Sequence, residues 1–253
     1  MPTAGEMYYF TSKTNGAKQP ILVLIHGAGG NYLHWPHNLR RLNHYKVYAP
    51  DLPGHGKSSG LGQQSVRSYA DAVARWMKSV GIDQAVIAGH SMGGAIAQML
   101  AIEYPKLVRA LILVATGAKL EVNQNLLFKL STPATTPSAV DDIIKWSWMP
   151  GTEQKLLQKV REQMLATRSA VIYGDYLACN NFDLTGSLKK IKAPTLVVVG
   201  ENDKMTPLDL NRQLEHEIKR AEMAVVPEAG HMVMLEQPDK VAREALTFLS
   251  KFS

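Results

Sequence analysis

Short apolar segments alternate with longer amphipathic segments along most of the chain. Six of the short segments are rich in aliphatic and β-branched residues and do not alternate polar with apolar positions. They cover residues 21–25, 46–49, 85–88, 111–114, 195–199 and 223–226. Strands that are covered on both faces have this pattern, which is typical of a parallel sheet with helices on each side.

The segments between these runs have the apolar spacing of helices. Between residues 66 and 80 apolar positions recur every three or four residues, and Gly81 ends the pattern. A second stripe covers 95–102, and a third covers 241–252, with Phe252 as its last member. Alternating strands and helices predict an α/β fold with a mostly parallel, twisted sheet flanked by helices.

One long segment, residues 117–190, lacks strand-like apolar runs. Helical patterns cover most of it, at 139–148, 153–168 and 169–180. A tract rich in Ser, Thr and Pro at 131–138 is expected to be a loop. We therefore predict a helical insertion between two strands, which divides the chain into a core of residues 1–116 and 191–253 and an inserted domain of residues 117–190.

Composition narrows the class of protein. Of the 253 residues, 45% are apolar and 20% are charged, which excludes an intrinsically disordered chain. Cys179 is the only cysteine, so an intramolecular disulfide and a thiolate metal cluster are excluded. The sequence has no recognisable secretion signal and no apolar run of the roughly 20 residues that a membrane span needs. We expect a cytoplasmic protein with no membrane partner.

The net charge of +6 and the isoelectric point of about 9.3 raise the question of nucleic-acid binding. Basic residues are spread along the chain, and the densest groups, at 155–168 and 189–192, have no interleaved aromatic residues that could stack on bases. We expect a solvated basic surface, no nucleic-acid partner, and at most a mild preference for anionic substrates.

The most specific chemical motif is Gly89-His90-Ser91-Met92-Gly93-Gly94, which joins a predicted strand to a predicted helix. In a G-x-S-x-G turn the small residues let the strand and the helix approach closely, so that the serine hydroxyl projects above the sheet. The amide of Met92 lies at the start of the helix, where negative charge is favoured. Ser91 is therefore a candidate nucleophile, and Met92 a candidate oxyanion donor.

A serine hydroxyl needs a base, and His231 is the best placed of the eight histidines. It follows the run 223–226, and α/β sheets place their chemistry at the carboxyl ends of strands. His55, in a glycine-rich loop, is the main alternative, whereas His26 and His90 flank glycines and are expected to shape loops. The remaining four are expected at the surface: His34, His37, His44 and His216.

The base in turn needs an acid that orients it and stabilises its imidazolium form. Asp203 follows the run 195–199 and is predicted to do this, with Glu201 as the nearest substitute. The order along the chain is then Ser91, Asp203, His231.

A glycine-rich loop, His26-Gly27-Ala28-Gly29-Gly30, directly follows the first strong strand. An oxyanion hole takes one amide from such an early loop, and we assign it to Ala28, with Gly29 as the alternative. The glycines do not complete a G-x-G-x-x-G dinucleotide motif, and no metal cluster is visible, so no cofactor is expected.

The sequence resembles the α/β-hydrolase fold superfamily, in particular its cap-bearing esterases and meta-cleavage-product hydrolases. The matching motifs occur in the family's order across nearly the whole chain, at 26–29, 51–58, 89–94, 200–203 and 230–231. The resemblance implies Ser91 as nucleophile, Asp203 as acid, His231 as base, and a helical cap over residues 117–190.

Departures from related patterns narrow the activity. Haloalkane dehalogenases and epoxide hydrolases of this fold have an aspartate where this chain has Ser91, and the loop 51–58 differs from that of proline iminopeptidases. We expect a hydrolase of small to medium carboxylic esters, a monomer or homodimer whose partner is its small-molecule ester substrate. Carbon–carbon hydrolysis of dienone acids and slow-turnover ligand sensing are the alternatives. Large residues expected either to line the site or to hold the cap on the core are Trp146, Trp148, Met149, Met164, Tyr173, Tyr176 and Phe182.

Overall fold

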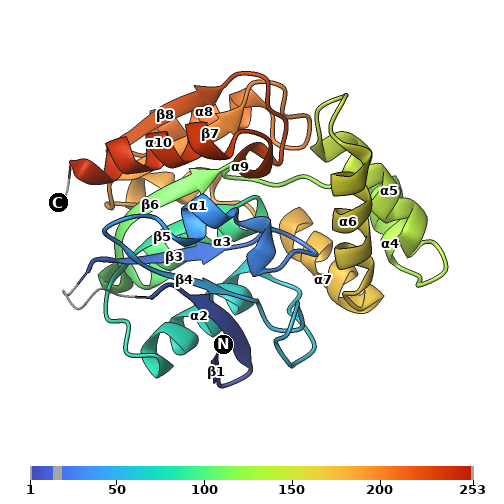
Figure 1. The fold of residues 1–253 in the computed structure, drawn as a ribbon, viewed down its shortest axis with the longest axis horizontal. Coiled ribbons are helices and arrows are strands. Elements are labelled where there is room, and N and C mark those ends of the chain that lie inside the picture. The colour runs from blue at the N-terminus through green and yellow to red at the C-terminus, as the bar shows by residue number, and fades with distance from the viewer. Residues whose placement is uncertain (1, 14–18, 252–253) are drawn as a thin grey trace.

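The apolar runs form the strands of one sheet in the computed structural model, which describes residues 2–13 and 19–251. Within these ranges eight strands lie in the order β1-β2-β4-β3-β5-β6-β7-β8 (Figure 1). Their bounds are β1 (Thr3–Ala4), β2 (Met7–Thr11), β3 (Ile21–Ile25), β4 (Lys46–Pro50), β5 (Ala85–His90), β6 (Val108–Val114), β7 (Thr195–Gly200) and β8 (Ala221–Val226). All neighbours from β4 to β8 are parallel, which confirms the predicted sheet. The two antiparallel strands at one side of the sheet, β1 and β2, were not predicted.

The register of the central strands aligns their carboxyl ends at one end of the sheet. Gly89, near the end of β5, lies between Ile25 of β3 and Leu113 of β6, and Val114 pairs with Val198 of β7. The loops that follow these strands therefore leave the sheet at nearly the same level. This brings together segments that are far apart along the chain.

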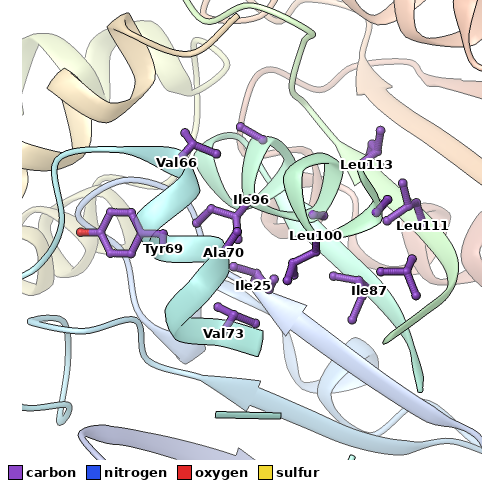
Figure 2. Close-up of a cluster of buried hydrophobic side chains, with 14 of the residues drawn as sticks. Ile25, Val66, Tyr69, Ala70, Val73, Ile87, Ile96, Leu100, Leu111 and Leu113 are labelled. Carbon is purple, nitrogen blue, oxygen red and sulfur yellow. The ribbon is translucent and has the colours of Figure 1, made fainter. Parts of the chain in front are cut away.

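Helices cover both faces of the sheet, as predicted. Their bounds are α1 (His37–Arg40), α2 (Val66–Ser79), α3 (Met92–Glu103), α8 (Leu208–Glu217), α9 (Val233–Glu236) and α10 (Pro238–Ser250), with 3₁₀ turns η1 (Tyr32–His34), η2 (Pro105–Leu107) and η3 (Thr185–Lys190). Alternate strand residues point to opposite faces: Ile87 joins the core under α2, α3 and α8, whereas Val86 and Ala88 join the core under α1 and α10. Figure 2 shows the first core, where Val73 and Leu100 of the helices meet the strand residues.

The helix ends follow local sequence signals. Helix α2 begins after Ser65, whose hydroxyl accepts the Ser68 amide at 3.1 Å, and ends before Gly81. Helix α3 begins at Met92, three residues before the predicted stripe. Phe252, predicted to belong to the last helix, lies outside the described residues. No helix in 2–13 or 19–251 is long and apolar enough to cross a membrane.

The segment between β6 and β7 is helical and gathers on one side of the molecule, the side toward which β6 runs (Figure 1). Its helices are α4 (Gln124–Leu130), α5 (Thr136–Ser147), α6 (Gln154–Leu165) and α7 (Ser169–Asn180). The last three match the predicted helices, but α4 was not predicted. The loop expected at 131–138 is shorter than predicted, because α5 begins at Thr136. Pro137 fits there since the first turn of a helix makes no use of its missing amide hydrogen.

Candidate active site

Ser91 lies at the tight turn between β5 and α3. Its backbone has φ 54° and ψ −119°, a region that residues with a side chain rarely adopt. A Cβ atom on Gly89 would lie 2.1 Å from the Gly93 carbonyl oxygen, and one on Gly93 would lie 2.3 Å from that of Ile25. Only glycine permits this approach of strand and helix. The Ser91 amide donates to the Val114 carbonyl at 3.0 Å, which ties the turn to the next strand.

The structure brings His231 and Asp203 together, as the sequence predicted for a base and its acid. His231 Nδ1 lies 2.9 Å and 3.1 Å from the two carboxylate oxygens, and both residues are buried. Nδ1 therefore carries a proton toward the carboxylate, which leaves Nε2 as the basic nitrogen of the neutral ring. Glu201, the alternative acid, is exposed.

The Asp203 carboxylate is held as an anion by several donors. The Met205 and Thr206 amides donate to Oδ1 at 2.8 and 2.9 Å, and the Thr206 hydroxyl donates to Oδ2 at 2.7 Å. Burial alone would raise the pKa of Asp203, but His231 and the Thr206 donors outweigh it, so the pKa lies below its usual range. Thr206 was not identified from the sequence.

The loop that carries His231 is held from two sides. His90 Nε2 donates to the His231 carbonyl oxygen at 2.9 Å, and burial lowers the pKa of His90 well below its usual value, so this ring is neutral. The Glu236 carboxylate accepts the Gly230 amide and the Met149 amide, each at 2.7 Å. Because Met149 follows α5, Glu236 also joins the loop that carries His231 to the inserted segment.

The early glycine-rich loop has Ala28 at the cavity beside Ser91. The neighbouring amides are already engaged: Gly29 donates to Asp175 Oδ2 at 2.8 Å, and Gly30 donates to the Gly27 carbonyl at 3.1 Å. Gly29, the alternative oxyanion donor, is therefore poorly suited to that role, which leaves Ala28. Met92 is the first residue of α3, where an amide has no acceptor within the helix.

A cavity of about 320 Å³ is lined by both Ser91 and His231. The segment 117–190 contributes much of its apolar wall, including Ile143, Trp148, Val160, Met164 and Tyr176. Of the seven large residues singled out in the sequence, Trp148, Met164 and Tyr176 line this cavity. The other four do not: Trp146, Met149, Tyr173 and Phe182.

Most of the polar side chains in the cavity wall are neutral, and Lys119 and Glu121 are the basic and acidic exceptions among the described residues. Within 2–13 and 19–251, Lys119 is the one lysine or arginine that lines it, and its ammonium pairs with Glu121 at 2.6 Å. His34, expected at the surface, is instead 7% exposed and lines the cavity, with no hydrogen-bond partner for Nε2. Burial lowers the pKa of His34 to about 4, so the ring is neutral at pH 7. No local pattern indicates this burial, because a three-residue 3₁₀ turn has no hydrophobic periodicity.

His55, the alternative base, is unsuited to that role. Its Nε2 faces Asp175 Oδ2 at 2.7 Å and its Nδ1 faces the Pro53 carbonyl at 3.1 Å, so both nitrogens donate. The ring is fully buried and does not line the cavity. His26 shapes its loop as expected: Nδ1 donates to the Gly27 carbonyl, and Nε2 accepts the Leu52 amide. In the described ranges no group of three or more His, Cys, Asp or Glu residues could hold a metal ion.

Comparison with known proteins places the chain in a family. The model of the alpha/beta hydrolase family matches residues 22–244. The chain belongs to the α/β hydrolase family. Within it, the chain is 28% identical to 2-hydroxy-6-oxo-6-phenylhexa-2,4-dienoate hydrolase of Burkholderia cepacia, over 90% of this chain and 87% of that enzyme. It is 32% identical to the dihydrolipoyllysine-residue acetyltransferase component of the acetoin cleaving system of Pseudomonas putida, over 91% of this chain but only 63% of that protein.

Two solved structures are similar to nearly the whole chain. A thermophilic esterase is 33% identical with a TM-score of 0.82, over 97% of this chain and 98% of that one. The enol-lactonase from Burkholderia xenovorans LB400 has a TM-score of 0.90 over 96% of both chains, at 22% identity. The second likeness shows the shared fold alone.

Proposed function

We propose that this α/β hydrolase is a serine esterase that cleaves small to medium carboxylic esters. The observation that carries the proposal is the placement of Ser91 and His231 on one cavity, with Asp203 behind the imidazole at 2.9 Å. A nucleophile, a base and an orienting acid in this arrangement form the machinery of acyl transfer.

In the proposed reaction His231 Nε2 takes the hydroxyl proton of Ser91 as Oγ attacks the ester carbonyl. The amides of Met92 and Ala28 stabilise the oxyanion of the tetrahedral intermediate. The C–O bond of the ester then breaks, and the alcohol leaves with the proton from His231. A water molecule deprotonated by the same imidazole attacks the acyl-enzyme and releases the acid.

The cavity supports a neutral, largely apolar substrate. Its volume of about 320 Å³ is at the small end for ligand sites, and aliphatic and aromatic side chains form most of its wall. Lys119, the cation in that wall, is already paired with Glu121. We further propose that the inserted segment, residues 117–190, acts as a cap domain on the core of residues 1–116 and 191–253. Such a cap would limit the length of the acyl chain and exclude water.

Carbon–carbon hydrolysis is the second candidate, because a dienoate hydrolase is 28% identical over most of this chain. That substrate carries a carboxylate, which would require Lys119 to exchange Glu121 for the ligand. We favour the ester because no other lysine or arginine of the described part of the chain lines the cavity.

A graded panel of p-nitrophenyl acyl esters, assayed beside a dienone acid, tests the proposal. Turnover of the esters that is lost in Ser91→Ala but kept in Ser131→Ala, an exposed serine, would support it. A fluorophosphonate should label Ser91 in the wild type and in Ser131→Ala only, as read by mass spectrometry. Preferential cleavage of the dienone acid would favour the second candidate. Silence on both substrates would favour a ligand-sensing protein of this fold.

A further inference from the structure

A buried carboxylate of the inserted segment contacts the loop that carries the predicted oxyanion donor. Asp175 lies on α7 and is 0% exposed. Its Oδ2 accepts the Gly29 amide at 2.8 Å and faces His55 Nε2 at 2.7 Å, while its Oδ1 accepts the Tyr69 hydroxyl at 2.5 Å. The three donors come from three parts of the core: the loop after β3, the loop after β4, and α2. Tyr69 points this hydroxyl away from the apolar cluster of the core (Figure 2).

The network is charged and fully satisfied. His55 donates at both nitrogens, to Asp175 and to the Pro53 carbonyl, so the ring is an imidazolium. Burial by itself would lower the pKa of His55, but the Asp175 carboxylate outweighs it and raises the pKa. Charges are retained in an interior only where partners surround them, which makes this cluster a specific attachment point for α7.

The bond to Gly29 controls the peptide planes around Ala28. Each planar peptide moves as a unit, so the plane between Ala28 and Gly29 is held where the Gly29 amide is held. The orientation of this plane also affects the position of Gly30, the next residue, whose amide donates to the Gly27 carbonyl at 3.1 Å. The Gly27 carbonyl belongs to the same peptide plane as the Ala28 N–H. Release of Gly29 from Asp175 would therefore free the plane between Ala28 and Gly29. The Gly27–Ala28 plane would then be held chiefly by His26 Nδ1, which lies 2.8 Å from the Gly27 carbonyl oxygen, so the direction of the Ala28 N–H would be less tightly fixed.

We propose that Asp175 is a positioning residue for the oxyanion hole. Its carboxylate, which belongs to the inserted segment, orients the Ala28 amide toward the substrate beside Ser91. The turnover rate therefore depends on the position of α7 relative to the loop that carries Ala28. This inference rests on the proposed esterase function. Asp175 does not touch the substrate in this scheme, because it acts through Gly29.

The test compares Asp175→Ala with Tyr69→Phe on a p-nitrophenyl ester, below the melting temperature of both variants. Asp175→Ala should lower kcat about 10- to 100-fold. Complete removal of an oxyanion donor typically lowers kcat by about 10²- to 10³-fold, and the loss here should be smaller because the Ala28 amide is misdirected rather than removed. KM should stay within about threefold, and the Ki of a trifluoromethyl ketone, which mimics the tetrahedral intermediate, should rise by the factor lost in kcat/KM. Asp175→Asn keeps one acceptor for Gly29 and should restore most of kcat.

Tyr69→Phe is the matched control, because it removes a donor to the same carboxylate but leaves the Gly29 bond in place. It should lower Tm and keep kcat within about twofold. Equal losses of kcat in Tyr69→Phe and Asp175→Ala would overturn the inference, since they would indicate general loosening of α7. Wild-type kcat and Ki in Asp175→Ala would overturn it as well.

Two further outcomes are distinguishable. If Asp175→Ala does not fold, the double variant D175L/H55L replaces it, because it removes both charges together and still leaves the Gly29 amide without its acceptor. The same loss of kcat is expected there, and wild-type kcat would contradict the proposal. If the wild type neither turns over esters nor reacts with a fluorophosphonate, the proposed function fails first.

Discussion

The backbone strain at Ser91 makes a sharp prediction about stability. Ser91 has a positive φ of 54°, and its carbonyl and amide are both tied to neighbouring strands and loops. Replacing it by Gly removes the Cβ that makes this conformation costly, whereas replacing it by Ala removes only the hydroxyl. Because both variants lack the nucleophile, their difference in the free energy of unfolding reports the strain, reduced by the greater conformational entropy that glycine loses on folding.

The magnitude follows from two opposing effects. Holding a residue with a side chain in such a region costs about 1–3 kcal/mol. Glycine loses about 0.4–1 kcal/mol more conformational entropy on folding, which offsets part of the relief. Ser91→Gly should therefore be more stable than Ser91→Ala by about 1–2 kcal/mol. For a chain of 253 residues, whose unfolding entropy is about 0.5 kcal/mol/K, that difference raises Tm by about 2–4 °C.

Urea denaturation and calorimetry of the two variants measure this difference directly. The same pair of substitutions at Ser68, inside α2, is the matched control, because glycine in a helix should be less stable than alanine by about 1 kcal/mol. The expected result is thus opposite signs at the two sites. If Ser91→Gly is no more stable than Ser91→Ala, the turn is not strained and the argument for a functionally imposed conformation is wrong.

Three further predictions concern the acid, the cavity and a buried imidazole. Asp203→Asn should lower kcat by about 10⁴-fold, because the His231 imidazole loses its orienting acceptor, and steady-state kinetics would show it. An Asn variant within tenfold of the wild type would exclude this role. Trp148→Leu should shift the preferred p-nitrophenyl ester toward longer chains and leave the rate of fluorophosphonate labelling unchanged; an unaltered chain-length profile would contradict the assigned wall. The fold lowers the pKa of His34 to about 4, so this imidazole binds a proton more readily in the unfolded chain. The contribution of its neutral ring to the free energy of unfolding is therefore complete above about pH 6.5 and is lost as the pH falls toward 4. Between pH 7.5 and 4.5 the wild type should lose about 2.5 kcal/mol more stability than His34→Phe in urea denaturation, and equal losses would refute the buried, neutral ring.

The parallel strands from β4 to β8, most of the helices and the order of the site motifs were predictable from the sequence. These features are encoded locally: apolar runs are the signature of strands covered on both faces, and glycines on either side of Ser91 mark a turn that no larger residue allows. The family of the chain was predicted on the same motifs and is confirmed by the comparison. The roles of Ser91, Asp203 and His231 stay predictions, although the structure brings the last two into contact.

Other features depend on contacts between segments that are far apart along the chain. Asp175 was not singled out because a single acid within an otherwise apolar helix has the same local pattern whether it faces solvent or a buried partner. Gly29 and Asp175 are 146 positions apart, and His55 acquires its charge only where the loop and α7 meet. His34 was misplaced at the surface for the same reason: its burial depends on the packing of a short turn against a distant segment. Polar contacts of this kind depend on which surfaces meet when the chain folds, and hydrophobic periodicity within one segment carries no information about its partner.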